Sequence, residues 1–164
     1  MTQNSVTALV EIPAMSRIKY EMDKETGRIF VDRFLKAPMY YPCNYGSIPK
    51  TLAGDGDELD ILVMTPEPVQ AGVYIFCRPI GVLHMQDEKG EDDKIIALPL
   101  DEYLSIHSIE DFEKAYSPLL ESLRYFFEHY KDLDKDKWVR VKSGFGDKAV
   151  AEKLIQQAID AYSL

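Results

Sequence analysis

The sequence of 164 residues contains only two cysteines, Cys43 and Cys77. Two cysteines do not make a disulfide framework, and no C-x-x-C pair suggests a zinc site. Both cysteines lie in apolar or aromatic runs, so we expect two reduced, buried thiols.

Targeting signals are also missing. The N-terminal stretch MTQNSVTALVEIP has no basic segment followed by an apolar run, so it does not resemble a signal peptide. No apolar run approaches the roughly 20 residues that a membrane-spanning helix needs. We therefore expect a cytoplasmic protein with no membrane partner.

Basic side chains are too few for a general nucleic-acid binder. The chain has 19 Lys and Arg against 28 Asp and Glu, which gives a formal net charge of -9. Phosphate backbones are bound mainly by Lys and Arg, so we expect no nucleic-acid partner. Such an acidic chain can still bind a polyanion when metal cations mediate the contact.

The hydrophobic content of 46% suits one compact domain, which we expect to span residues 1–164. Period-two patterns and turn signals predict strands at 7–12, 18–22, 29–34, 59–64, 73–85, 95–100 and 138–142. The strands at 18–22 and 29–34 look like a hairpin with Gly27 in its turn, and Pro79 and Gly81 predict a bend in the long strand.

Helical periodicity is confined to the C-terminal third. Ser108 predicts the start of a short helix, and the pair Ser117 and Pro118 predicts the start of a second one. Asp147 should cap a last helix, with a buried stripe of Val150, Leu154 and Ala158 and with Tyr162 as a further candidate. The predicted fold class is α+β, mainly β: a small OB-like closed β-barrel with flanking C-terminal helices.

The densest chemical signal is the run Asp55-Gly56-Asp57-Glu58-Leu59-Asp60, which leads into an apolar strand. Close carboxylates repel one another unless cations hold them together, and Mg²⁺ prefers oxygen ligands. A solvated acidic turn is the plain alternative. The spacing does not match an EF-hand loop.

A second acidic loop runs from Asp87 to Lys94. Alone, it is most simply an ordinary charged hairpin. If it meets the first acidic loop at one end of a barrel, the two could hold several metal ions.

Basic and phenolic residues lie in or near the same segments. Arg can clamp phosphate with two hydrogen bonds, Lys supplies a point charge, and Tyr donates a hydrogen bond. Each residue alone is more often a surface charge or a half-buried aromatic. The candidates are Lys19, Arg33, Lys94, Lys131, Tyr41, Tyr45 and Tyr130.

The acidic run resembles a motif of the family I soluble inorganic pyrophosphatases of bacterial type. Further segments resemble that family in its order, from about residue 8 to 142. They are VEIP at 10–13, IKYE at 18–21, VDRF at 31–34, YPCNYG at 41–46, Asp87 and Glu88 with Asp92 and Lys94, and EHYK at 128–131. Together these ordered motifs are far more specific than one acidic run.

The resemblance implies roles for the matching residues. Asp55, Asp60 and Asp92 would bind a first metal, with Asp60 bridging to a second, and Asp87 with Asp92 would bind a further one. Metal-bound waters would be held by Glu11, Glu21 and Glu88. The phosphates would be held by Lys19, Arg33, Tyr45, Lys94, Tyr130 and Lys131. Tyr41 would support the site, and Asp57 would be the general base.

The implied activity is that of a hydrolase, an inorganic diphosphatase. Metal-activated water would split inorganic pyrophosphate into two phosphates, with several Mg²⁺ ions in each site of a homohexamer. The main alternative is a non-catalytic OB-type barrel that binds oligonucleotide or metal, and a second is a phosphatase for organic esters. His84, His107 and His129 lie outside the acidic motifs and receive no catalytic role.

Overall fold

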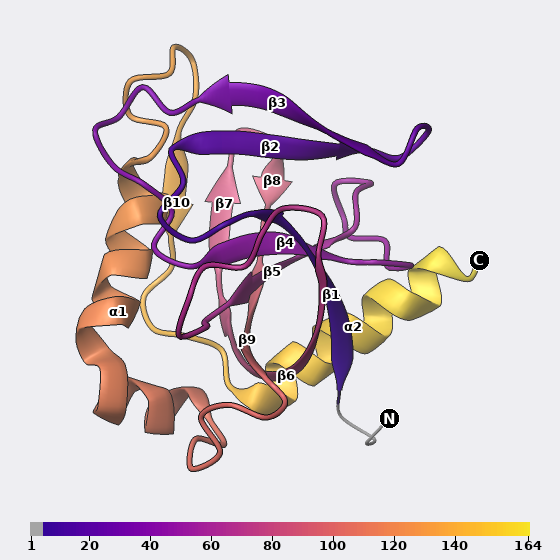
Figure 1. Cartoon of the computed structure of the whole chain (residues 1–164), viewed down its shortest axis with the longest axis vertical. Helices are drawn as coiled ribbons and strands as arrows, with labels where there is room; N and C mark the ends of the chain where they lie inside the picture. Colours follow the sequence, from indigo (N-terminus) through magenta and orange to yellow (C-terminus); the bar gives the residue numbers. More distant parts are fainter. Residues whose placement is uncertain (1–4) are drawn as a thin grey trace.

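Five strands close into a barrel in the computed structural model, which describes residues 5–164 (Figure 1). Their order around the barrel is β1 (Val6–Ile12), β4 (Asn44–Ile48), β5 (Leu59–Val63), β9 (Lys94–Pro99) and β6 (Tyr74–Leu83). Neighbours are antiparallel except β5 and β9, which are parallel. The predicted closed β-barrel is confirmed, although β4 was not among the expected strands.

The central strands are buried on both faces, which explains their nearly continuous apolar sequences. On β9, Ile95 and Ala97 belong to a hydrophobic cluster that includes residues of the C-terminal helix. The alternate residues Ile96 and Leu98 belong to a second cluster, which includes the preceding helix. The barrel wall therefore carries a hydrophobic core on each side.

Smaller sheets complete the β-structure. The hairpin of β2 (Ile18–Asp23) and β3 (Arg28–Phe34) confirms the prediction, and Gly27 takes the positive φ that its turn requires. The strands β7 (Met85–Asp87), β8 (Gly90–Glu91) and β10 (Val139–Val141) form a three-stranded sheet. The expected long strand is divided at His84, and its predicted bend is the register shift between Pro79 and Gly81.

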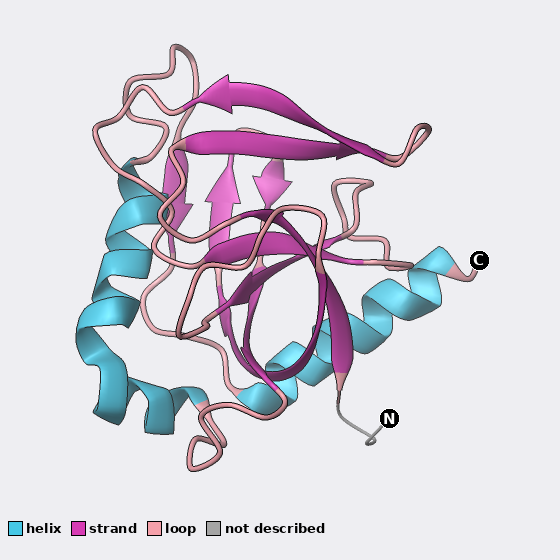
Figure 2. Cartoon of the chain, in the orientation of Figure 1, coloured by secondary structure: helices cyan, strands magenta, loops and turns pink. Residues whose placement is uncertain are grey.

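The first helix, α1 (Ile109–His129), packs outside the barrel (Figure 2). Ser108 is its N-cap, as predicted, because the Ser108 hydroxyl accepts a hydrogen bond from the Asp111 backbone N–H. The expected second start at Ser117 is confirmed to within one residue. Two helical segments meet at a kink at Tyr116, and Pro118 lies in the first turn of the second segment, where a missing N–H costs no hydrogen bond.

The second helix, α2 (Lys148–Tyr162), is capped by Asp147 and buries Ala158, both as predicted, but the rest of its buried face is displaced by one residue. Its buried residues are Ala151, Ile155 and Ala158. The expected face is wrong at Val150 and Tyr162, which are exposed, and Leu154 is only partly buried. Small side chains let the helix lie close to the barrel, and this close approach selects the alanine face.

No helix within the described residues is both long enough and apolar enough to cross a bilayer. Cys43 and Cys77 are free and buried, as expected.

The contact between β1 and β4 depends on Gly46. A Cβ atom at this position would stand 1.9 Å from the backbone oxygen of Leu9, which cannot move aside without breaking the strand pair. We expect Gly46→Ala to lower the free energy of unfolding by about 3 kcal/mol. Urea denaturation of the metal-free protein would measure this loss.

Gly54→Ala is the matched control, because a Cβ at Gly54 meets nothing within 4 Å. We expect its unfolding free energy to stay within about 0.5 kcal/mol of wild type. Equal urea midpoints for the two variants would show that the barrel accommodates a Cβ atom at residue 46 without loss of stability.

Candidate active site

One pocket collects nearly all of the candidate site residues. It lies between the β2–β3 hairpin, the acidic loop before β5, the β7–β8 turn and the segment after α1. Its lining includes Glu11, Lys19, Glu21, Arg33, Tyr45, Asp55, Asp57, Asp60, Asp87, Glu88, Asp92, Tyr130 and Lys131. The two other candidates, Lys94 and Tyr41, are buried beside it.

Lys94 is the centre of the site, although only 1% of it is exposed. Its Nζ lies 2.7 Å from Asp60 Oδ2, 3.0 Å from Asp92 Oδ1 and 3.3 Å from the Tyr45 hydroxyl. Burial alone would lower the pKa of Lys94. The charges of Asp60 and Asp92 outweigh that effect and hold the pKa well above its ordinary value, so the ammonium stays charged.

At Asp92, by contrast, burial has a larger effect on the pKa than the charge of Lys94. Burial and the nearby charge of Asp60 raise its pKa, although Lys94 acts to lower it. One ammonium therefore does not fully compensate two partly buried carboxylates. This corner of the pocket favours additional positive charge.

Aromatic rings fix the phenols of the site. Tyr41 packs against Phe126 of α1 with ring centroids 4.6 Å apart, and against Tyr45 at 5.8 Å. Tyr130 stacks on Phe126 at 5.2 Å. Helix α1 thus holds the wall that carries Tyr45 and Tyr130, and Tyr41 supports that wall from behind.

Next to Tyr130 on the same wall, Lys131 pairs with the second acidic loop. Its Nζ lies 2.9 Å from Asp87 Oδ2 and 3.8 Å from Glu88 Oε1. Burial acts to raise the pKa of Asp87, but the hydrogen bond from Lys131 prevails and lowers it. Asp87 is therefore held in its charged form.

The β2–β3 hairpin presents two cations through one carboxylate that received no role in the sequence analysis. Asp32 Oδ2 lies 2.9 Å from Lys19 Nζ and 2.9 Å from Arg33 Nε. Lys19 and Arg33 face each other in the strand register, so their alignment could have been predicted from the hairpin. The shared role of Asp32 could not, because it depends on side-chain directions.

The first acidic loop is tied to its surroundings by two contacts that sequence reasoning missed. Asp57 Oδ1 lies 3.1 Å from Lys24 Nζ at the hairpin tip, and Glu58 Oε2 accepts a 2.8 Å hydrogen bond from Ser47. Within the loop, Asp55 accepts a hydrogen bond from the backbone N–H of Asp57. The Asp57 carboxylate is 73% exposed, so it faces the solvent of the pocket rather than the core.

Glu11 contributes a half-buried carboxyl from β1. Burial, together with the charges of Asp60, Glu58 and Glu21, raises its pKa to about 7. A hydrogen bond from the backbone N–H of Met22 acts in the other direction. Cations bound near these acids would favour the ionised form of Glu11.

The residues present suit divalent cations in their chemistry. Within residues 5–164, no three acidic, histidine or cysteine side chains converge as a finished metal site. Two ammonium groups, those of Lys94 and Lys131, contact Asp60, Asp92 and Asp87 instead. The available donors are all carboxylate oxygens, which are the ligands of Mg²⁺, and the lysines mark where the pocket accepts positive charge.

The raised pKa of Glu11 makes stability depend on pH. Its ordinary pKa is 4.5, so between pH 4.5 and about 7 the folded chain binds more protons than the unfolded chain. Stability therefore falls as pH rises through this window. Without metal, Glu11→Gln should match wild type near pH 5 and be about 2 kcal/mol more stable at pH 8.

Urea titrations in a chelator at the two pH values would measure this difference. The substitution keeps an acceptor for the Met22 N–H, so the comparison isolates the charge. A stability difference that is the same at pH 5 and pH 8 would contradict the assignment of the buried charge to Glu11.

A closed barrel that brings acidic donors, cationic side chains and phenols together in one pocket defines a protein class. It is the class that binds a phosphate polyanion together with divalent cations. The comparisons with known proteins place the chain more narrowly.

The family described as inorganic pyrophosphatase matches residues 8–163. An inorganic pyrophosphatase of Rickettsia typhi is 51% identical over 159 residues, covering 96% of this chain and 89% of that protein. One of Pseudomonas aeruginosa is 49% identical over 161 residues, covering 97% and 91%. The solved inorganic pyrophosphatase of Helicobacter pylori superposes with a TM-score of 0.93 at 44% identity, covering 98% and 95%. The chain belongs to the inorganic pyrophosphatase family.

Proposed function

We propose that the protein hydrolyses inorganic pyrophosphate to two phosphate ions with the help of several Mg²⁺ ions. The observation that carries this proposal is the meeting of four candidate metal-binding aspartates and five phosphate-binding candidates at one pocket, with the sixth, Lys94, buried beside it. The family membership supports the same activity.

The cations would be held by Asp55, Asp60, Asp87 and Asp92. They would supply charge neutralisation and an acidified water. Glu11, Glu21 and Glu88 line the same pocket and would accept hydrogen bonds from waters around the cations.

Pyrophosphate would enter between two cationic walls. Lys19 and Arg33 face the pocket from the hairpin, and Lys131 faces it from the segment after α1. Each of these cations already contacts a carboxylate, so bound phosphate oxygens would replace one anionic partner by another. The Tyr45 and Tyr130 hydroxyls and Lys94 would hold the phosphate oxygens nearest the barrel.

Asp57 would accept the proton of the attacking water. Its carboxylate is exposed within the pocket, and its visible partner is the flexible side chain of Lys24. A base for water must be reachable by the substrate, and this exposure meets that need. Charge that develops on the leaving phosphate would be stabilised by Lys and Arg.

A phosphate-release assay tests the proposal. With Mg²⁺, pyrophosphate should be hydrolysed, and a chelator should abolish the reaction. Ca²⁺ should inhibit, because its looser coordination does not enforce the tight octahedron of Mg²⁺. Equal turnover with and without chelated metal would refute the mechanism, and full activity with Ca²⁺ would refute its geometric basis.

The same assay with organic phosphate esters and an oligonucleotide-binding measurement would test the alternatives. The oligonucleotide alternative is not supported. The pocket is lined by many acids, whereas a strand-binding barrel needs a basic, aromatic face.

We also propose one catalytic domain over residues 1–164, a cytoplasmic location and a homohexamer. The free, buried thiols of Cys43 and Cys77 are compatible with a reducing compartment.

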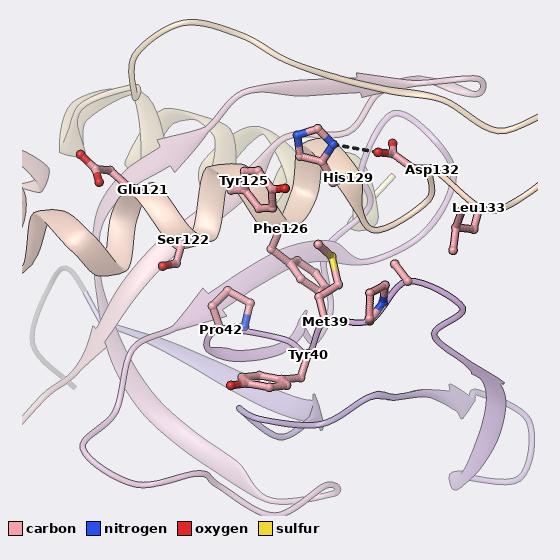
Figure 3. Close-up of a pocket in the computed structure, with 12 residues that line it drawn as sticks. Met39, Tyr40, Pro42, Glu121, Ser122, Tyr125, Phe126, His129, Asp132 and Leu133 are labelled. Atoms are coloured by element: carbon pink, nitrogen blue, oxygen red, sulfur yellow. Dashed lines mark hydrogen bonds and ion pairs between the residues drawn. The ribbon is translucent and has the colours of Figure 1, made fainter.

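For the homohexamer, the supporting feature is an apolar groove between residues 37–42 and α1 (Figure 3). Tyr40, Tyr125 and Leu133 are exposed along it. Light scattering that shows a monomer at micromolar concentration would contradict the hexamer.

A further inference from the structure

His84 and Asp93 form a pair to which the proposed chemistry assigns no role. Leu83 is the register partner of Lys94, and the Asp92 backbone N–H donates to the Met85 carbonyl at 2.9 Å. These contacts place His84, between β6 and β7, opposite Asp93, in the link between β8 and β9. His84 Nδ1 and Asp93 Oδ1 are 3.1 Å apart.

The position of Asp93 in the chain connects this pair to the site. Successive side chains of an extended chain point to opposite faces, so Asp93 points away from the side shared by Asp92 and Lys94. Asp92 and Lys94 contact each other at 3.0 Å on that other side. Holding Asp93 on the outer face therefore holds both neighbours toward the pocket.

His84 is itself firmly placed. Its carbonyl accepts a 2.8 Å hydrogen bond from the Lys142 backbone N–H, and its ring lies against Gly146. A Cβ atom on Gly146 would stand only 2.6 Å from His84 Nε2. The imidazole thus rests on the segment that joins β10 to α2, which is held to β6 by two backbone hydrogen bonds between Val82 and Gly146.

Asp93 is less well satisfied. In the described part of the chain, its Oδ1 is buried without an aligned hydrogen-bond donor, and His84 Nδ1 is the polar atom 3.1 Å from it. The preceding turn, from Glu88 to Glu91, is exposed and offers little packing. Asp92 is also repelled by Asp60 and Asp87. A contact is therefore needed to hold the backbone at the start of β9 in position, and His84 is placed to make it.

We propose that His84 and Asp93 are positioning residues for the active site. Their contact holds the start of β9 in the register that keeps Asp92 and Lys94 at the spacing needed for a cation and a phosphate. This inference rests on the proposed function, because Asp92 is taken there as a metal ligand.

The test measures Mn²⁺ binding to the full chain without substrate, by electron paramagnetic resonance of the free ion. Mn²⁺ takes the same oxygen ligands as Mg²⁺. We expect Asp93→Ala and His84→Ala each to raise the Mn²⁺ dissociation constant by about tenfold, as is usual when a partner behind a metal ligand is lost. The double variant should be no weaker than either single variant.

Two comparisons separate positioning from simple loss of charge. Asp93→Asn keeps the shape and an acceptor, so positioning predicts binding within about twofold of wild type. If charge alone mattered, Asp93→Asn would weaken binding as much as Asp93→Ala, and His84→Ala would not weaken it at all. Either result would overturn the inference.

Lys142→Ala is the matched control, because Lys142 contacts the same turn from the segment after β10. It removes an exposed ion pair, in which Lys142 Nζ lies 2.9 Å from Glu91, and should leave Mn²⁺ binding within about twofold. Melting temperatures show that each variant is folded.

The wild-type protein separates the two possible failures. If it neither binds Mn²⁺ nor releases phosphate from pyrophosphate, the proposed function fails and the positioning role falls with it. If the wild type does both, while His84→Ala and Asp93→Ala bind Mn²⁺ as tightly as wild type, only the positioning role is refuted.

Discussion

Replacing Asp57 by asparagine should lower the turnover of pyrophosphate by roughly 10²–10⁴, which is the usual contribution of a positioned general base. The fold should be unaffected, because the lost contact with Lys24 is an exposed ion pair. Metal binding should change little, because the other acidic side chains remain. The pH–rate profile should move to higher pH, since hydroxide must then form without a base.

Asp60→Asn is the comparison that distinguishes a general base from a metal ligand. Asp60 lies only three positions away, but its Oδ2 contacts the buried Lys94 at 2.7 Å, whereas Asp57 faces solvent. In the proposed role of metal ligand, Asp60 is needed for metal affinity, so Asp60→Asn should require much more Mg²⁺ to reach its own maximal rate. Its pH profile should not follow that of Asp57→Asn.

Rates measured against Mg²⁺ concentration at several pH values decide between these roles. If the two variants give the same metal titration and the same pH profile, the aspartates are interchangeable parts of one acidic cluster. The assignment of Asp57 as the base would then have no support.

Replacing Lys94 by methionine should produce the second large effect. Methionine fills a similar volume, but Asp60 and Asp92 would face each other without the ammonium between them. Without metal, the free energy of unfolding should fall by about 3 kcal/mol, as expected when one partner of a buried ion pair is removed. Turnover should fall at least 10²-fold, because the substitution removes a preorganised charge from the proposed phosphate-binding site.

Added Mg²⁺ should stabilise Lys94→Met more than it stabilises wild type, because a bound cation can replace the positively charged partner that Asp60 and Asp92 have lost. Thermal melts with and without Mg²⁺ would measure this difference. Lys148→Met is the control, since Lys148 forms an exposed pair with Glu152 on α2, 3.9 Å apart, and its loss should cost less than about 0.5 kcal/mol. Equal melts for Lys94→Met and wild type would show that the central lysine does not hold the two carboxylates.

Local features of the fold could be predicted from the sequence because they depend on residues close together in the chain. Ser108 and Asp147 cap their helices through the backbone N–H groups three residues ahead. Gly27 forms the turn of the hairpin, and Pro79 with Gly81 interrupts the long strand. The two acidic loops could also be located, since their charge density is visible in the sequence itself.

Predictions failed where two solutions were locally equivalent. The faces of α2 that begin at Val150 and at Ala151 are both apolar, and only the close approach to the barrel selects the second. The second helical segment begins one residue earlier than predicted, at the kink at Tyr116, because the apolar residues on both sides of the kink pack on the same core. The strand β4 escaped prediction because Asn44, Tyr45 and Gly46 show no simple alternation, although the barrel pairs them on both sides.

The sequence by itself determined which side chains were available for chemistry and the order in which they occur along the chain. The tertiary structure alone decided which of them meet. Lys94 is adjacent in sequence to Asp93, yet its buried ammonium contacts Asp60, 34 positions earlier, and Asp93 instead turns outward to His84. The reason is that burial and ion pairing depend on barrel closure, which brings together strands distant in sequence and sets the local dielectric, whereas propensity and capping act within a few residues.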